Sequence, residues 1–361
     1  EIHTEDGAVG NAIAPSGAST GSSEVLELRD GDPRRYDGRG VLKAVENVNA
    51  VIAPALLGKD SAEQGVCDAV LKELDSSAQK SVLGGNATIA VSLALGHAAA
   101  ASKRVPLYEH LHQIIREGTS ALGFDPELFP APVLPVPETN MISGGLHAGG
   151  NLDFQDVLIA PIGAPDYPTC LEWIVRVYNR LGKLLRERGF EGYLVGDEGG
   201  YGPRLTSNRD AVALVTQAIE AAGLSAGDDV AITLDVASTH FYNDGKYHLR
   251  AEQGRVLSSS EMIDTLESWV NEFPIISIED GLAEDDWEGW QELQRRLGDR
   301  ILLVGDDLFT TNADRVRRGI EMQAANSVLV KVNQIGSLTE TIETMAVGRQ
   351  AGFSLVVSAR S

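Results

Sequence analysis

Cysteine is scarce in this chain, and the little there is forms no recognisable pattern. Only Cys67 and Cys170 occur among 361 residues, and they lie far apart. Two cysteines are too few for a disulfide framework, and they supply too few ligands for a cysteine zinc site. Because proteins without disulfides are usual in a reducing compartment, we expect a cytoplasmic location.

Long apolar runs and positive charge are also lacking. No window holds ~18 consecutive apolar residues, so we expect no membrane span. Lys+Arg total 30 against Asp+Glu 52, a net charge of -22. Nucleic-acid binding requires cations that neutralise phosphates, so we expect no nucleic-acid partner. The acidic residues are spread along the sequence, as is typical of a solvated surface.

The usual nucleotide-binding motifs are missing as well. No Gly-x-Gly-x-x-Gly motif follows an apolar run in the Rossmann manner, and no Walker A lysine motif is present. After about residue 130, short Val/Ile/Leu runs alternate with helix-length amphipathic segments. Such sustained alternation favours a (β/α) barrel over an open doubly wound sheet.

The first part of the chain has a different organisation. A hairpin-like opening leads to a Gly/Ser/Thr loop at 14–21, and a proline-rich junction follows at 130–137. We therefore predict an N-terminal α+β domain over 1–130 and a barrel over 131–361, whose C-terminal end is missing from the given chain. Helical periodicity predicts helices around 40–55, 61–75 and 88–103.

Four apolar runs after the junction each end in a charged residue. Because the carboxyl ends of barrel strands meet on one face, these side chains should converge there. Converging carboxylates repel one another unless a cation lies between them, and Mg²⁺ prefers such oxygen ligands. Alternatively, each acidic residue caps the helix that follows it. The four residues are Asp235, Glu279, Asp306 and Lys331.

Several of these candidates have alternatives within the sequence. Asp280 and Asp307 are rivals to their neighbours, and strand alternation should point only one of each doublet at the ion. Lys331, inside an apolar run, is either a lysine whose amine reaches water or a general base beside a dication. Glu198 and His147 lie in glycine-flanked loops and could be ordinary loop residues or members of a site.

Several long motifs, in order, make the chain similar to the enolase family. They run from one end of the sequence to the other, so chance similarity is not a serious rival. The motifs are Ala-Pro-Ser-Gly-Ala-Ser-Thr-Gly at 14–21, Gly-Asp-Glu-Gly-Gly at 196–200, Leu-Asp-Val-Ala at 234–237, Ser-Ile-Glu-Asp-Gly-Leu-Ala-Glu-Asp-Asp-Trp at 277–287, Gly-Asp-Asp-Leu at 305–308 and Lys-Val-Asn-Gln-Ile-Gly-Ser-Leu-Thr-Glu-Thr at 331–341.

The resemblance implies a lyase that reversibly dehydrates 2-phosphoglycerate to phosphoenolpyruvate, as in glycolysis and gluconeogenesis. It implies two Mg²⁺ ions per active site, the second arriving with substrate and contacting Ser19 in a mobile loop. Lys331 would remove the C2 proton, and Glu198 would protonate the departing C3 hydroxyl. The implied ligands of the tighter ion are Asp235, Glu279 and Asp306.

Other implications concern the substrate, fold and assembly. Arg360 and Ser361 match positions that hold the phosphate, and His147 matches a histidine near the leaving hydroxyl. Asp156 matches a glutamate that supports the acid. The fold would be a small α+β domain followed by a TIM-type barrel that starts ββαα, in a homodimer or higher homo-oligomer.

Some positions depart from the family pattern. Asp156 replaces a glutamate, Ala359 replaces a histidine near the substrate, and His240 stands where a glutamate is common. These changes motivate an alternative, namely a paralogue acting on a related phosphorylated or phosphonate three-carbon acid. A non-catalytic protein would be expected to lose Lys331 or a metal carboxylate, and all four are present.

Overall fold

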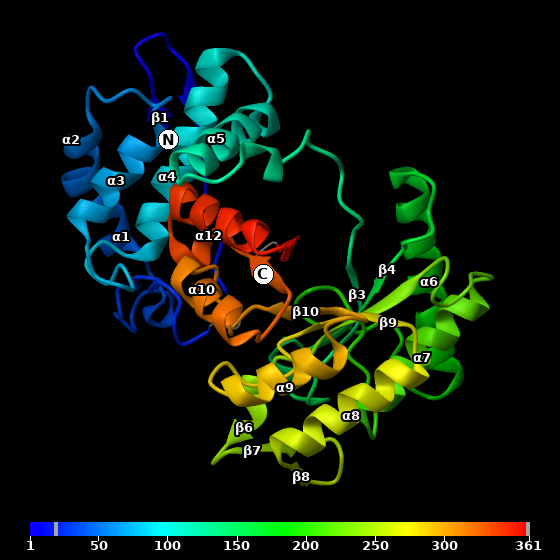
Figure 1. Ribbon diagram of the computed structural model, residues 1–361. Helices are drawn as coiled ribbons and strands as arrows, with labels where there is room; N and C mark the ends of the chain where they lie inside the picture. The colour runs from blue at the N-terminus through cyan, green and yellow to red at the C-terminus, as the bar shows by residue number, and fades with distance from the viewer. Residues whose placement is uncertain (18–20, 359–361) are drawn as a thin grey trace. The chain divides into compact units, whose positions relative to one another are not determined.

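The computed structural model describes residues 1–17 and 21–358, and these form two compact units (Figure 1). Ser19, Arg360 and Ser361 lie outside the described residues. Unit 1 comprises 1–133, 309–318 and 328–358, and unit 2 comprises 134–308 and 319–327.

Unit 1 opens with the expected hairpin. Strands β1 (Ile2–His3) and β2 (Val9–Gly10) pair antiparallel, with Ile2 opposite Gly10. The three predicted helical regions are present, the first as two α-helices joined by a π-helical turn at Val48–Ile52. Their bounds are α1 Leu42–Asn47, α2 Ala53–Leu56, α3 Gln64–Leu74 and α4 Gly85–Lys103, and an unpredicted α5 follows at Leu107–Ala121.

The last elements of the chain belong to unit 1 as well. Helix α12 packs against α3, α4 and α5, and Figure 1 shows it in red beside the cyan helices. The bounds are α11 Val332–Ile335, α12 Leu338–Gln350 and β12 Ser354–Val357. Before them come α10 Ala313–Met322 and β11 Ser327–Val330, each of which contains residues assigned to both units.

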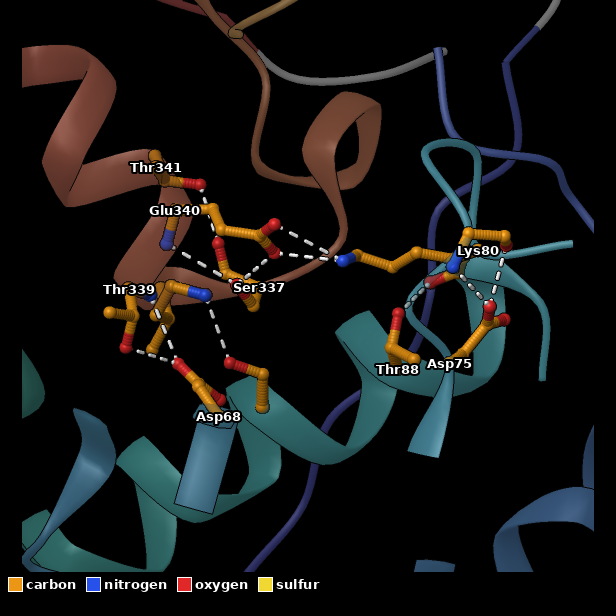
Figure 2. Close-up of polar contacts among 12 residues, drawn as sticks. Asp68, Asp75, Lys80, Thr88, Ser337, Thr339, Glu340 and Thr341 are labelled. Atoms are coloured by element: carbon orange, nitrogen blue, oxygen red, sulfur yellow. Dashed lines mark hydrogen bonds and ion pairs between the residues drawn. The ribbon is translucent and has the colours of Figure 1, made fainter. Parts of the chain in front are cut away.

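Polar contacts join the start of α12 to α3 and to the loop between α3 and α4 (Figure 2). The Thr339 N–H donates to Asp68 Oδ2 at 3.0 Å, and its hydroxyl donates to the same oxygen at 2.6 Å. Lys80 Nζ lies 3.0 Å from Glu340 Oε2, and the Lys80 side chain is almost fully buried. The Thr339 N–H is one of the first N–H groups of α12, which lack partners within the helix, and Asp68 accepts its hydrogen bond. These contacts therefore join two distant parts of the sequence.

The sheet of unit 2 has the strand order β10-β9-β5-β4-β3. Pairs β3·β4 and β4·β5 are antiparallel, whereas β5·β9 and β9·β10 are parallel. Two helices separate β4 from β5, so this unit starts ββαα, as the resemblance implies. The strands are β3 Thr139–Ser143, β4 Asp156–Ala160, β5 Ala231–Asp235, β9 Ile275–Glu279 and β10 Leu302–Gly305.

Helices α7 and α8 pack on these strands, and α6 packs on α7. Ser207 accepts a hydrogen bond from the Asp210 N–H, so it is the N-cap that the sequence predicts. No helix in the described part of the chain is long and apolar enough to span a bilayer. The helices are α6 Tyr167–Glu187, α7 Asn208–Ala221, α8 Ser259–Glu272 and α9 Trp287–Leu297.

Two local expectations differ from the structure. The predicted strand at 193–195 is absent, because Val195 forms only an isolated bridge with Tyr201 and the chain then turns into the Glu198 loop. A small antiparallel sheet after β5 was not predicted, since its strands are too short for an alternating pattern to emerge. Its strands are β6 Tyr242–Asn243, β7 Lys246–Leu249 and β8 Arg255–Leu257.

Candidate active site

Three acidic residues form a row across the sheet of unit 2. Asp156 on β4 is the register partner of Asp235 on β5, and Asp235 is the partner of Glu279 on β9. Register partners on adjacent strands point to the same face, and the strands lie about 4.8 Å apart. Continuing the row, Val304 on β10 is the partner of Glu279, and Asp306 follows two residues later. The row therefore places Asp235 and Glu279 as neighbours on one face, as the sequence predicts.

Asp280 holds the chain just after β10. Its two carboxylate oxygens accept the backbone N–H groups of Asp306 at 3.0 Å and Asp307 at 2.7 Å. Its own φ is 41°, a conformation that aspartate adopts far less readily than glycine. Strand alternation stops at Gly305, so it does not decide which side chain of the Asp306–Asp307 doublet faces the ion.

One oxygen from each of Asp280, Asp306 and Asp307 lies within 4.8 Å of the others, and all three residues are buried. Burial, together with the neighbouring charges of Asp307 and Asp306, raises the pKa of Asp280 well above its ordinary value. A buried, all-oxygen set whose negative charges oppose one another is suited to a hard divalent cation. This group of acidic residues therefore suits a metal ion.

A second cluster joins His147, Asp156 and Glu198. His147 Nδ1 lies 2.7 Å from Asp156 Oδ2 and 3.8 Å from Glu198 Oε2. Burial alone would lower the pKa of His147, but the hydrogen bond to Asp156 and the charges of Asp156, Glu198 and Asp235 raise it. Burial raises the pKa of Asp156, whose other oxygen accepts the Ser143 hydroxyl at 2.6 Å. The cluster brings a histidine and two carboxyl groups within reach of one another.

Two glycines allow the Glu198 loop to lie close to β3. A Cβ at Gly200 would fall 2.5 Å from Ser143 Oγ, and one at Gly196 would fall 2.7 Å from the His147 carbonyl oxygen. Asn140 Nδ2 donates to Glu198 Oε2 at 2.9 Å. This packing places the Glu198 carboxyl beside His147.

Sequence reasoning missed three polar residues that support these groups. Asn140 and Ser143 belong to β3, which was not predicted as a strand. Gln155 donates from Nε2 to Asp235 Oδ2 at 2.9 Å and lies directly before Asp156. Its place beside a candidate residue was the only available signal.

His240 lies within electrostatic range of both clusters. Burial and the nearby charge of His147 lower its pKa, whereas Asp306 acts in the opposite direction. It lies on the 3-10 turn Ser238–Phe241, immediately after β5. A family-atypical position is therefore part of the electrostatic environment of these carboxylates.

Lys331 belongs to unit 1 and follows β11 directly. Its backbone N–H donates to Thr311 Oγ1 at 2.9 Å, and the residue is half-buried. Ser19, Arg360 and Ser361, the remaining candidates, lie outside the described residues.

Comparison with models of known protein families shows to which family this chain belongs. Residues 131–361 match the enolase C-terminal TIM barrel domain, and residues 1–111 match the enolase N-terminal domain. The chain belongs to the enolase family. The predicted fold class, an N-terminal α+β domain followed by an enolase-type barrel, is thereby confirmed. Enolase-family domains indicate a lyase acting on a small molecule, and the family is generally metal-dependent.

Proposed function

We propose that this enolase-family protein catalyses the Mg²⁺-dependent, reversible dehydration of 2-phosphoglycerate to phosphoenolpyruvate. The observation that carries the proposal is the row of Asp156, Asp235 and Glu279 on one face of the sheet, with Glu198 held beside His147. The row has the charge a divalent cation needs, and the Glu198 carboxyl group is chemically suited to proton transfer.

Asp235, Glu279 and Asp306 are the proposed ligands of the tighter Mg²⁺, and Asp280 keeps the Asp306 backbone in place. When bound, Mg²⁺ would supply positive charge that stabilises negative charge developing on the substrate carboxylate. A second Mg²⁺ is proposed to arrive with substrate, with Ser19 as a further oxygen ligand.

Lys331 is proposed as the general base, and Glu198 as the general acid. The neutral Lys331 amine would take the proton from C2, and the C2–H electron pair would move first into the substrate carboxylate. The pair would then form the C2=C3 bond when the C3 hydroxyl leaves. Glu198 would give a proton to the C3 hydroxyl, which leaves as water. Arg360 and Ser361 would bind the phosphate, a role for which the guanidinium fork is suited.

His147 and Asp156 would hold Glu198 and the leaving hydroxyl in position. Because the pKa of His147 is raised, its protonated form persists to higher pH than in an ordinary histidine. A protonated His147 offers a second N–H donor toward the leaving oxygen. We further propose a cytoplasmic glycolytic enzyme that assembles as a homodimer or larger homo-oligomer.

The direct test mixes the protein with 2-phosphoglycerate and Mg²⁺ and follows the ultraviolet absorbance of phosphoenolpyruvate. A rapid rise that EDTA abolishes is the expected result. The rival paralogue, favoured by Asp156 and Ala359, would turn over 2-phosphoglycerate at about one per cent or less of its rate on the preferred acid. Folded, Mg²⁺-binding protein that gives no rise would overturn the proposal.

Two variants separate the proposed acid and base. Lys331→Ala should abolish exchange of the C2 proton with solvent deuterium while Mg²⁺ binding is largely retained. Glu198→Gln should block dehydration yet still permit C2 exchange, because the base remains. Persistent exchange in Lys331→Ala would remove Lys331 from its role, and loss of both processes in Glu198→Gln would contradict the division of labour.

A further inference from the structure

A buried hydrogen-bond chain in unit 1 begins at the Lys331 backbone. The Lys331 N–H donates to Thr311 Oγ1 at 2.9 Å, and Thr311 Oγ1 donates to Gln334 Oε1 at 2.7 Å. Thr311 and Gln334 are buried, at 0% and 1% exposure. The side chain of Gln334 therefore reaches the proposed base through a single hydroxyl.

The same glutamine continues the chain into the N-terminal segment. Gln334 Nε2 donates to Glu24 Oε1 at 3.3 Å, and the backbone carbonyl oxygen of Gln334 accepts the Val25 N–H at 2.9 Å. Glu24 Oε1 also accepts the Gly21 N–H at 2.9 Å. Next to Gln334, Asn333 Nδ2 donates to the Pro15 carbonyl oxygen at 3.2 Å. The turn α11, directly after Lys331, thus holds the N-terminal segment at Pro15 and again at 21–25.

Two further features of the surroundings bear on this arrangement. A cavity of about 270 Å³ lies beside them, lined by Pro15, Gly21, Glu24 and Asn333 among others. Thr311 has a φ of 50°, which is unfavourable for a β-branched residue and persists only where the surroundings require it. Thr344 Oγ1 helps to impose it by donating to the Thr311 carbonyl oxygen at 2.7 Å.

We propose that Gln334 is a positioning residue, which fixes Lys331 through Thr311 and couples it to the N-terminal segment through Glu24. Its amide supplies one acceptor and one donor in opposite directions, a combination that neither a carboxylate nor an apolar side chain provides. This inference rests on the proposed role of Lys331. It adds that Glu24, distant in sequence, influences proton abstraction without touching the substrate.

The first test uses Gln334→Met, which keeps the approximate length of the side chain and removes its hydrogen bonds to Thr311 and Glu24. We expect C2 exchange and kcat to fall roughly 10- to 100-fold with KM little changed, because a small displacement of the base slows proton transfer. The matched control is Gln64→Met in the same unit. Gln64 is 3% exposed and donates to Asp68 and Ser92, so its loss removes a buried amide away from Lys331.

A second test exchanges the donor and acceptor. Gln334→Glu should slow exchange because a carboxylate cannot donate to Glu24 and would repel it. Combining it with Glu24→Gln restores a donor facing an acceptor at unchanged net charge, so at least part of the lost rate should return. The proposal would be overturned if Gln64→Met slowed C2 exchange as much as Gln334→Met does. It would also be overturned if the effects of Gln334→Glu and Glu24→Gln on the rate simply added in the double variant.

A third measurement separates this inference from the proposed function. This measurement is the rate of chemical acylation of Lys331, followed by mass spectrometry relative to the rate at the exposed Lys246. It requires no substrate. It should change in Gln334→Met and be unaffected by Gln64→Met. Wild-type protein that exchanges no C2 proton of 2-phosphoglycerate would refute the proposed function, whereas unchanged Lys331 acylation in folded Gln334→Met would refute the positioning role alone. Thr311→Val, which keeps the β-branched shape and removes the hydroxyl between Gln334 and the Lys331 N–H, provides the same reading should Gln334→Met unfold.

Discussion

At the scale of single residues, Asp156 binds two neighbours, Ser143 and His147, and raises the pKa of His147. Its two oxygens are occupied by His147 and by the Ser143 hydroxyl, at 2.7 and 2.6 Å. An aspartate is one methylene shorter than the glutamate common in the family, yet its hydrogen bonds here have ordinary lengths. The shorter side chain therefore still binds the histidine beside Glu198.

Replacing Asp156 by asparagine should lower the pKa of His147. The substitution removes the strongest interaction that raises this pKa, and burial then favours the neutral ring. A raised folded pKa gives His147 a stabilising contribution that is complete below about pH 6.5 and lost as pH rises through the folded value. The destabilisation by Asp156→Asn should accordingly shrink with rising pH. Proton NMR titration of the His147 ring checks the shift, and an unchanged pKa would contradict it.

At the scale of elements, the loop that carries Glu198 depends on its glycines. Gly200→Ala should lower the dehydration rate by roughly 10- to 100-fold, because the new Cβ would lie 2.5 Å from Ser143 Oγ and displace the loop. Mg²⁺ affinity should change little, since the carboxylates at Asp235 and Glu279 lie on other strands. Steady-state kinetics with calorimetric Mg²⁺ titration measures both.

Gly202→Ala is the control for that experiment. A Cβ at Gly202 would meet its nearest neighbour, Ala148, at an ordinary 3.5 Å. Near wild-type kinetics are expected from this variant. Equal rate losses in Gly200→Ala and Gly202→Ala would contradict the prediction. They would show that the dehydration rate responds to the loss of backbone flexibility at a glycine and not to displacement of the Glu198 loop.

The attachment of α12 is a second property of elements. Lys80→Met should lower the free energy of unfolding by about 3–5 kcal/mol, because it leaves the Glu340 carboxylate without its cation at a largely buried site. Lys183→Met removes an exposed partner of Glu187 and should cost about 0–1 kcal/mol. Urea unfolding measures both, and a similar small cost for the two variants would refute the stapling role of Lys80.

At the scale of the whole molecule, the net charge of -22 opposes compaction. Adding NaCl should raise the melting temperature by screening this repulsion. MgCl₂ at equal ionic strength should raise it further, because specific binding stabilises the fold by about 2.7 kcal/mol when the ion is at ~100 times its Kd. Asp306→Asn should reduce the extra increment while leaving the NaCl effect. Equal shifts from the two salts would argue against a specific ion site.

Local patterns determined much of the secondary structure. Apolar runs predicted β5 to end at Asp235 and β9 to end at Glu279, and both strands do so. The reason is that burial of alternate or continuous apolar side chains is already visible in a short window of sequence. Short or irregular segments, such as β3 and the hairpin strands at 242–257, carry too little periodicity to be predicted this way.

By itself, the sequence determined the fold class, the acidic residues at strand ends and the membership of the enolase family. Only the tertiary structure decided which groups meet. Asp280 binds two backbone amides, Asn140 and Gln155 support candidate site residues, and Gln334 joins Lys331 to Glu24. Such contacts link positions far apart in the chain, and long-range hydrogen bonds leave no periodic trace. They arise once packing has removed water and each buried polar group must find a partner.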